Sequence, residues 1–211
     1  DFGATSFFPS KNLGGMGDSG LVTTQDDALA ERARILRVHG MQPKYYHREV
    51  GANFRMDPLQ AAMLHLKLPH LPEYNCARAG NAHFYHAALK GRVGIAENRP
   101  GADAAAKVLL PVDFSSQGIW NQFTLRVPGG RRDALKAFLT ARKIGCEIYY
   151  PIPLHRQECF ASAGYRGGDS VPVSEQLSAE VLSIPIFPEL TAEQRQWVAD
   201  SLADFAAGKT E

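Results

Sequence analysis

The chain has 211 residues, and its 23 lysines and arginines nearly balance 22 aspartates and glutamates, giving a net charge of +1. This balance argues against a nucleic-acid or polyanion surface and favours small-molecule chemistry. Three cysteines without a C-x-x-C pair are typical of reduced thiols rather than of a disulfide framework. Because the sequence has neither a long apolar run nor a signal peptide, we expect a soluble, cytoplasmic protein without a membrane partner.

The first predicted element is a short aromatic strand over residues 4–8 that stops at Pro9 and leads into Lys11. The stretch after Lys11 is rich in glycines, which can take positive φ and let the backbone pass close to a bound group. A lysine placed here could be partly desolvated, which would lower its pKa toward the nucleophilic amine of Schiff-base chemistry. A solvated lysine in a surface turn is the alternative, since most lysines are solvated. Before a second strand over 21–24, four glycines occur within seven residues: Gly14, Gly15, Gly17 and Gly20.

Two nucleotide-binding motifs can be excluded in this stretch. Residues 15–20 fit the pattern G-x-G-x-x-G, but a strand follows them where a dinucleotide site needs a helix. A phosphate-binding P-loop has its lysine after the glycines, whereas Lys11 precedes them. Lys11 therefore needs a different explanation.

A helix is predicted over 26–38, because Asp26 or Asp27 can cap its start and Gly40 ends it. The following stretch, 41–54, is irregular and aromatic. Loops of this length are usually functional or disordered.

A second helix is predicted over 57–68, where Asp57 is the N-cap, Pro58 occupies the first position and Gln60 completes a capping box. Two prolines then interrupt the helical pattern before a third helix, which is predicted over 73–89. Four histidines on or between these helices lack H-E-x-x-H spacing and nearby carboxylates, so we expect no metal site: His65, His70, His83 and His86.

Residues 91–106 are predicted to join a second module, in which strands and helices alternate. Such an order favours a small mixed sheet covered by helices. Thr191 and Gln194 form the capping box of its final helix. The other predicted elements are strands over 108–112, 120–127 and 146–150, a helix over 131–143, an extended segment over 150–155 that fixes His155, and a helix over 191–205.

The stretch from Ser6 to Gly20 resembles the lysine signature of the DegT/StrS family of pyridoxal-phosphate-dependent sugar-nucleotide aminotransferases. The resemblance covers essentially all 211 residues and implies an α/β fold, the C-terminal part of a fold-type-I transferase. Residues 1–91 would then end the large cofactor-binding domain, and 92–211 would form the small domain. We expect a longer portion to precede Asp1 in the whole enzyme. Further motifs match in order and spacing: 36–40, 44–47, 53–57 with 60–62, 150–155 and 185–190.

The resemblance implies pyridoxal 5′-phosphate as cofactor and gives roles to three residues. Lys11 would be the catalytic lysine that binds the cofactor covalently and then moves a proton. Ser6 would hydrogen-bond the cofactor phosphate. Asn53 would reach the phosphate in the neighbouring subunit, which implies a homodimer with shared active sites. Without the resemblance, a structural asparagine in a turn is the favoured interpretation of Asn53.

The implied reaction transfers an amino group from glutamate or glutamine to a nucleotide-linked keto sugar in amino-sugar, polysaccharide or antibiotic biosynthesis. Arg55, Tyr149 and His155 are candidate substrate residues. Arg55 could bind an anion or form a structural salt bridge, and Tyr149 stands where the family commonly has histidine. A sugar dehydratase of the same superfamily is the alternative enzyme, although such proteins often carry histidine in place of Lys11. A catalytically silent fragment that acts as an interaction module is the other alternative.

Overall fold

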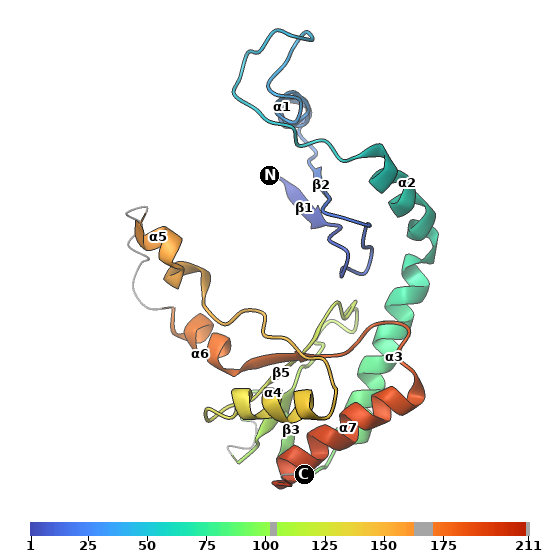
Figure 1. Ribbon diagram of the computed structural model, residues 1–211, viewed down its shortest axis with the longest axis vertical. Helices are drawn as coiled ribbons and strands as arrows, with labels where there is room; N and C mark the ends of the chain where they lie inside the picture. Colours follow the sequence, from blue (N-terminus) through green and yellow to red (C-terminus); the bar gives the residue numbers. More distant parts are fainter. Residues whose placement is uncertain (102–104, 163–170, 210–211) are drawn as a thin grey trace. The chain divides into compact units, whose positions relative to one another are not determined.

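The computed structural model describes residues 1–101, 105–162 and 171–209 (Figure 1). The chain divides into two compact units, Asp1–Tyr74 and Asn75–Glu211. This division falls inside helix α3 (Leu71–Leu89), earlier than the predicted boundary after residue 91. The reason is that Tyr85 and Leu89 of α3 are buried in the core of the second unit. The assignment of 1–91 and 92–211 to two transferase domains stays a prediction.

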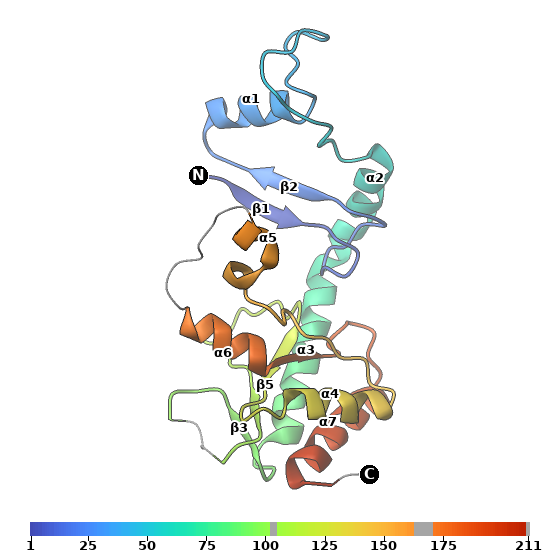
Figure 2. The same cartoon turned by 60° about the vertical axis from the view of Figure 1, so that its left-hand side comes forward.

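The first unit contains one antiparallel strand pair, β1 (Gly3–Ser6) and β2 (Gly20–Thr23), with Ser6 opposite Gly20 (Figure 2). Both predicted strands are confirmed with small shifts at their ends. Every residue of the two strands is exposed. Two isolated strands are marginally stable in water, so this pair depends on the elements around it.

The helices of the first unit begin at the predicted caps. Asp26 accepts hydrogen bonds at the start of α1 (Asp27–Leu36), and Asp57 accepts one from the Leu59 N–H at the start of α2 (Pro58–Lys67). The predicted end of α2 near Leu68 is confirmed, and the interruption is a single turn of 3-10 helix, η1 (Leu68–His70), that leads directly into α3. Pro69 and Pro72 lie in the first turns of η1 and α3, where a missing N–H costs little.

The second unit contains the predicted mixed sheet, and its strands lie in the order β3-β4-β5-β6. The β3–β4 pair is parallel, and the other two pairs are antiparallel. Sequence reasoning missed β3, because three residues inside a glycine- and proline-containing stretch give no periodic signal. The four strands are β3 (Ile95–Glu97), β4 (Val108–Leu110), β5 (Phe123–Arg126) and β6 (Val181–Ile184).

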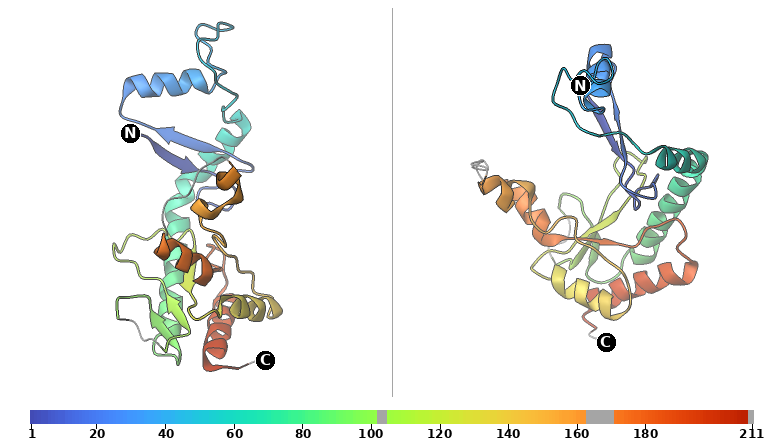
Figure 3. Two further views of the ribbon diagram at one scale, coloured as in Figure 1. Left: turned by 90° about the vertical axis from the view of Figure 1, so that its left-hand side faces the viewer. Right: turned by 45° about the horizontal axis from the view of Figure 1, so that its top comes forward.

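Three long helices, α3, α4 and α7, contribute to the core of this unit, and α4 and α7 lie side by side (Figures 1 and 3). Phe123 and Leu125, on one face of β5, are fully buried against them. Full burial of such a side chain stabilises the fold by about 1.5–3 kcal/mol. The remaining helices are α4 (Arg132–Ala141), η2 (Leu154–Arg156), α5 (Glu158–Ser162), α6 (Pro172–Glu180) and α7 (Ala192–Ala207).

Three predicted strands of the second unit are shorter than expected, and the one over 108–112 already ends at Leu110. The strand over 146–150 is reduced to one bridge, in which Glu147 and Ser183 each donate the backbone N–H to the other's carbonyl oxygen. The strand over 120–127 begins only at Phe123, since Trp120 has a φ of 45°, outside the extended region.

The capping box of α7 is confirmed: Thr191 accepts from the Gln194 N–H, and the Gln194 side chain accepts from the Thr191 N–H. None of the helices in the described part of the chain combines the length and apolar character that a membrane-spanning segment needs.

Candidate active site

Lys11 lies in a closed loop between β1 and β2. Backbone hydrogen bonds close the loop: Phe7 N–H donates to Ser19 O at 2.9 Å, and Gly15 N–H donates to Phe7 O at 2.8 Å. The Lys11 N–H itself donates to Phe8 O at 2.8 Å, which forms a turn just beyond β1. Its side chain is partly buried. The structure therefore places Lys11 after the end of a strand, as the sequence predicts.

The glycines of the loop are required to different degrees. A Cβ atom on Gly14 would lie 2.2 Å from the carbonyl oxygen of Pro9, so the backbone would have to move. A Cβ atom on Gly15 or Gly17 would lie 2.9 or 2.6 Å from the end of the Gln60 side chain, which can rotate away. Gly14 is thus the position at which any larger residue must change the loop.

Helix α2 holds the loop through two side chains. Gln60 Oε1 accepts a hydrogen bond from the Met16 N–H at 2.8 Å, and Lys67 Nζ donates to Gly14 O. The prediction that Gln60 completes the α2 capping box is wrong, because its oxygen binds the loop instead. Sequence reasoning missed both contacts, since they join residues 44 and 53 positions apart and leave no local pattern.

Ser6 is the last residue of β1 and lies on the same loop as Lys11. Its Oγ accepts a hydrogen bond from the Phe8 N–H at 3.2 Å, and the side chain is otherwise exposed. A hydroxyl that accepts one bond still has its own proton to donate. The loop therefore offers an amine and a hydroxyl donor five residues apart in the sequence.

Asn53 and Arg55 lie on the irregular segment between α1 and α2. Asn53 forms a single β-bridge with Val38, and its Oδ1 accepts from the Arg55 N–H at 3.3 Å. Both side chains are exposed. Within residues 1–101, 105–162 and 171–209, no carboxylate forms an ion pair with Arg55, so the structural salt bridge considered for it is not observed there.

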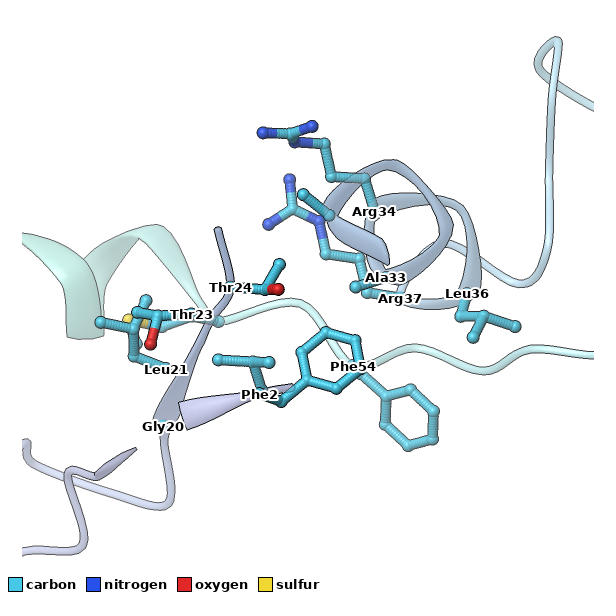
Figure 4. A pocket seen from close by; sticks show the side chains of 13 residues that line it. Phe2, Gly20, Leu21, Thr23, Thr24, Ala33, Arg34, Leu36, Arg37 and Phe54 are labelled. Carbon is cyan, nitrogen blue, oxygen red and sulfur yellow. The ribbon is translucent and has the colours of Figure 1, made fainter. Parts of the chain in front are cut away.

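A hollow of about 720 Å³ in the first unit is lined by residues of β2 and α1 and by Phe54 and Met56, which flank Arg55 in the sequence (Figure 4). In the close-up, the Arg34 and Arg37 side chains extend from α1 in the same direction, and the aromatic rings of Phe2 and Phe54 lie beside the strands. Neither Ser6 nor Lys11 lines this hollow. Four apolar residues that line the hollow are exposed to solvent: Phe2, Leu21, Val22 and Phe54 are 54%, 49%, 59% and 72% exposed.

The remaining predicted residues, Tyr149 and His155, belong to the second unit. Tyr149 is exposed, with its ring centroid 5.6 Å from that of Tyr150. His155 is mostly buried, and its Nε2 lies 3.0 Å from Oε1 of Glu175 on α6. Arg156 also binds this carboxylate, and hydrogen bonds from His155 and Arg156 hold the pKa of Glu175 below its usual value. Sequence reasoning missed Glu175.

Residues 1–203 match the model of the DegT/DnrJ/EryC1/StrS aminotransferase family. The chain is 43% identical over 201 residues to the "Pleiotropic regulatory protein" of Geobacillus stearothermophilus, covering 95% of this chain and 50% of the relative. It is 41% identical over 194 residues to the UDP-N-acetyl-3-dehydro-alpha-D-glucosamine 3-aminotransferase of Acidithiobacillus ferrooxidans, covering 92% of this chain and 48% of the relative. The chain therefore spans about half the length of these curated relatives.

The fold agrees with these matches. A crystal structure of DesV from S. venezuelae, in complex with a ketimine intermediate, superposes with a TM-score of 0.83 at 37% identity. The superposition covers 100% of this chain and 52% of the DesV chain. The α/β fold implied by the resemblance is thereby confirmed. Sequence and structure together establish that this chain belongs to the DegT/DnrJ/EryC1/StrS aminotransferase family.

Proposed function

We propose that this chain supplies the lysine-bearing part of a pyridoxal-phosphate-dependent aminotransferase. The observation that carries the proposal is the closed loop that presents Lys11 beyond β1. The enzyme transfers an amino group from glutamate or glutamine to a nucleotide-linked keto sugar in amino-sugar, polysaccharide or antibiotic biosynthesis. The name of the Acidithiobacillus relative supports this substrate class.

The residues of the loop fit the cofactor. Pyridoxal phosphate needs an amine for its aldehyde and donors for its phosphate, and Lys11 and Ser6 are of these two kinds. Gly14, Gly15 and Gly17 keep the loop compact, because a Cβ atom there would meet the Pro9 oxygen or the Gln60 side chain. When bound, the cofactor supplies a ring that withdraws electrons from the reacting carbon.

The residues at this site have separate roles. Lys11 Nζ would be the nucleophile that attaches the cofactor, and as a free amine it would move one proton from the α-carbon of the amino donor to a carbon of the cofactor. Ser6 donates its hydroxyl proton to the phosphate, a charge-assisted hydrogen bond of about 1.5–3 kcal/mol. Gln60 and Lys67 keep the loop in place from α2.

The other residues are assigned to the phosphate and the substrate. The exposed carboxamide of Asn53 serves the phosphate in a second subunit of a cytoplasmic homodimer, and Arg55 binds a phosphate or a substrate carboxylate. Tyr149 and His155 contact the nucleotide-linked sugar. The exposed side chains of Asn53 and Arg55 support these assignments, since a ligand can reach both.

Reductive labelling tests the lysine. The 211-residue chain is incubated with pyridoxal phosphate, treated with borohydride and digested, and the modified peptides are identified by mass spectrometry. We expect the label on Lys11, and its loss in Lys11→Ala but not in the control Lys44→Ala, which removes an exposed lysine beside Tyr45. A label spread over the surface lysines, unchanged in Lys11→Ala, would refute the proposal.

A further inference from the structure

One carboxylate oxygen joins α6 to the turn that contains His155. Glu175 Oε1 lies 3.0 Å from His155 Nε2, 3.0 Å from Arg156 Nε and 2.8 Å from Arg156 Nη2. His155 and Arg156 belong to η2, which follows the proline-containing segment 150–153. Glu175 therefore fixes both the position of this turn and the orientation of the imidazole ring.

The contact also decides which ring nitrogen carries a proton. The hydrogen bond from His155, followed by that from Arg156, lowers the pKa of Glu175, so its carboxyl group is ionised at neutral pH. An ionised carboxylate can only accept hydrogen bonds, and Nε2 must therefore be the donor. In the neutral ring, Nδ1 then keeps its lone pair. Within the described part of the chain, no hydrogen bond involves this Nδ1.

We propose that Glu175 is a positioning residue that holds His155 with Nδ1 as an acceptor for a hydroxyl group of the sugar substrate. This inference rests on the proposed function for the identity of the substrate. A histidine free to exchange its tautomers would present an N–H donor part of the time, and a hydroxyl proton would then have no acceptor. Fixing the tautomer in advance removes this unproductive state. Carboxylates do the same for metal-binding histidines when they accept a hydrogen bond from the other ring nitrogen.

A second histidine–glutamate pair provides the control. His70 Nδ1 lies 3.8 Å from Glu73 Oε2, too far for a hydrogen bond, and the two side chains are 60% and 80% exposed. The side chains of His155 and Glu175 are only 15% and 32% exposed. The same two residue types are thus hydrogen-bonded and shielded in one pair, and solvated in the other.

Nitrogen-15 NMR of the histidine rings at pH 8 tests the inference in the 211-residue chain. We expect His155 to show one neutral tautomer, protonated at Nε2. Glu175→Ala should give a mixture of tautomers like that of His70, and Glu175→Gln should retain the Nε2–H form, because its amide oxygen still accepts. Glu73→Ala should leave the His70 signals unchanged. An Nδ1–H form in the parent, or His155 signals unaffected by Glu175→Ala, would overturn the inference.

Measuring the two half-reactions of amino transfer separately distinguishes a positioning role of Glu175 from an effect on folding. In a chimera that joins this chain to the part of the Acidithiobacillus relative outside the matched region, Glu175→Ala should slow amino transfer to the sugar by at least tenfold. It should leave uptake of the amino group from the donor unchanged. An equal loss in both half-reactions would overturn the role toward the sugar. A parent chimera without any activity would instead count against the proposed function, whereas the NMR result does not depend on activity.

Discussion

Gln60 Oε1 accepts a hydrogen bond from the Met16 N–H at 2.8 Å and so ties α2 to the loop that contains Lys11. The second tie, from Lys67 Nζ to Gly14 O, comes from the same helix two turns later. The two contacts hold the loop at Gly14 and at Met16. The position of Lys11 therefore depends on a helix that follows it by more than forty residues.

Gln60→Ala should loosen the loop, because the Met16 N–H loses its acceptor. A hydrogen bond of this kind contributes about 0.5–1.5 kcal/mol, so amide exchange at Met16 should accelerate about twofold to tenfold. Hydrogen exchange followed by NMR measures this change. The control Gln196→Ala removes an exposed glutamine whose side chain binds Asp200 on α7, and should not alter Met16. Unchanged protection of Met16 in Gln60→Ala would show that other contacts hold the loop.

Gly14→Ala should destabilise the first unit, whereas Gly80→Ala should not destabilise the second. The new methyl group at Gly14 would meet the Pro9 oxygen at 2.2 Å, while at Gly80 nothing lies within 4 Å. Overpacking costs about 1–3 kcal/mol, and replacing an interior helix glycine by alanine gains about 0.5–1 kcal/mol. Urea unfolding of both variants gives the comparison. Equal stabilities would mean that the loop adjusts freely around Gly14.

Tyr85→Phe should lower the free energy of unfolding of the second unit. The fully buried Tyr85 hydroxyl donates to Pro185 O at 2.9 Å, and burial raises its pKa far above the usual value, so it stays neutral. Without the hydroxyl, the carbonyl oxygen loses its partner at a cost of about 1–3 kcal/mol. Urea unfolding should show this loss, but not in Tyr46→Phe, where the side chain is 69% exposed. A loss of similar size in both variants would contradict the assignment.

Acid should weaken the contacts of Asp204. Hydrogen bonds from Lys209 and Arg142 lower the pKa of Asp204 below its usual 3.8. A depressed pKa in the folded state means that the stabilisation is complete above the unfolded value and is lost as pH falls through the folded value. Asp204→Asn should therefore reduce the stability difference between pH 6 and pH 2. Asp200→Asn, on the same helix, should retain it, and an identical pH dependence in Asp204→Asn would refute this explanation.

Local signals in the sequence predicted much of the structure. Asp26, Asp57 and Thr191 cap helices as expected, because a cap depends on residues within one turn. The strand before Lys11 was also predictable, since Pro9 limits how far it can extend. The family resemblance extended these signals to the whole chain, and the comparisons confirm the membership.

Contacts between distant residues were not predictable in the same way. Gln60 follows an N-cap at the spacing of a capping box, yet its oxygen binds Met16 instead. Glu175 lies 20 residues from His155, and their hydrogen bond follows no sequence period. Both contacts arise because tertiary packing brings the side chains together, and single-sequence patterns do not contain that information.

Amino transfer by the chimera with the Acidithiobacillus relative tests whether Lys11 is the catalytic lysine. The purified chimera is loaded with pyridoxal phosphate and assayed with glutamate or glutamine and UDP-N-acetyl-3-dehydro-glucosamine. We expect formation of the amino sugar, and a loss of several orders of magnitude in Lys11→Ala, because the attachment point and the proton carrier disappear together. Lys44→Ala should retain the parent rate. Amino transfer at near-parental rate by the folded Lys11→Ala chimera would contradict the account.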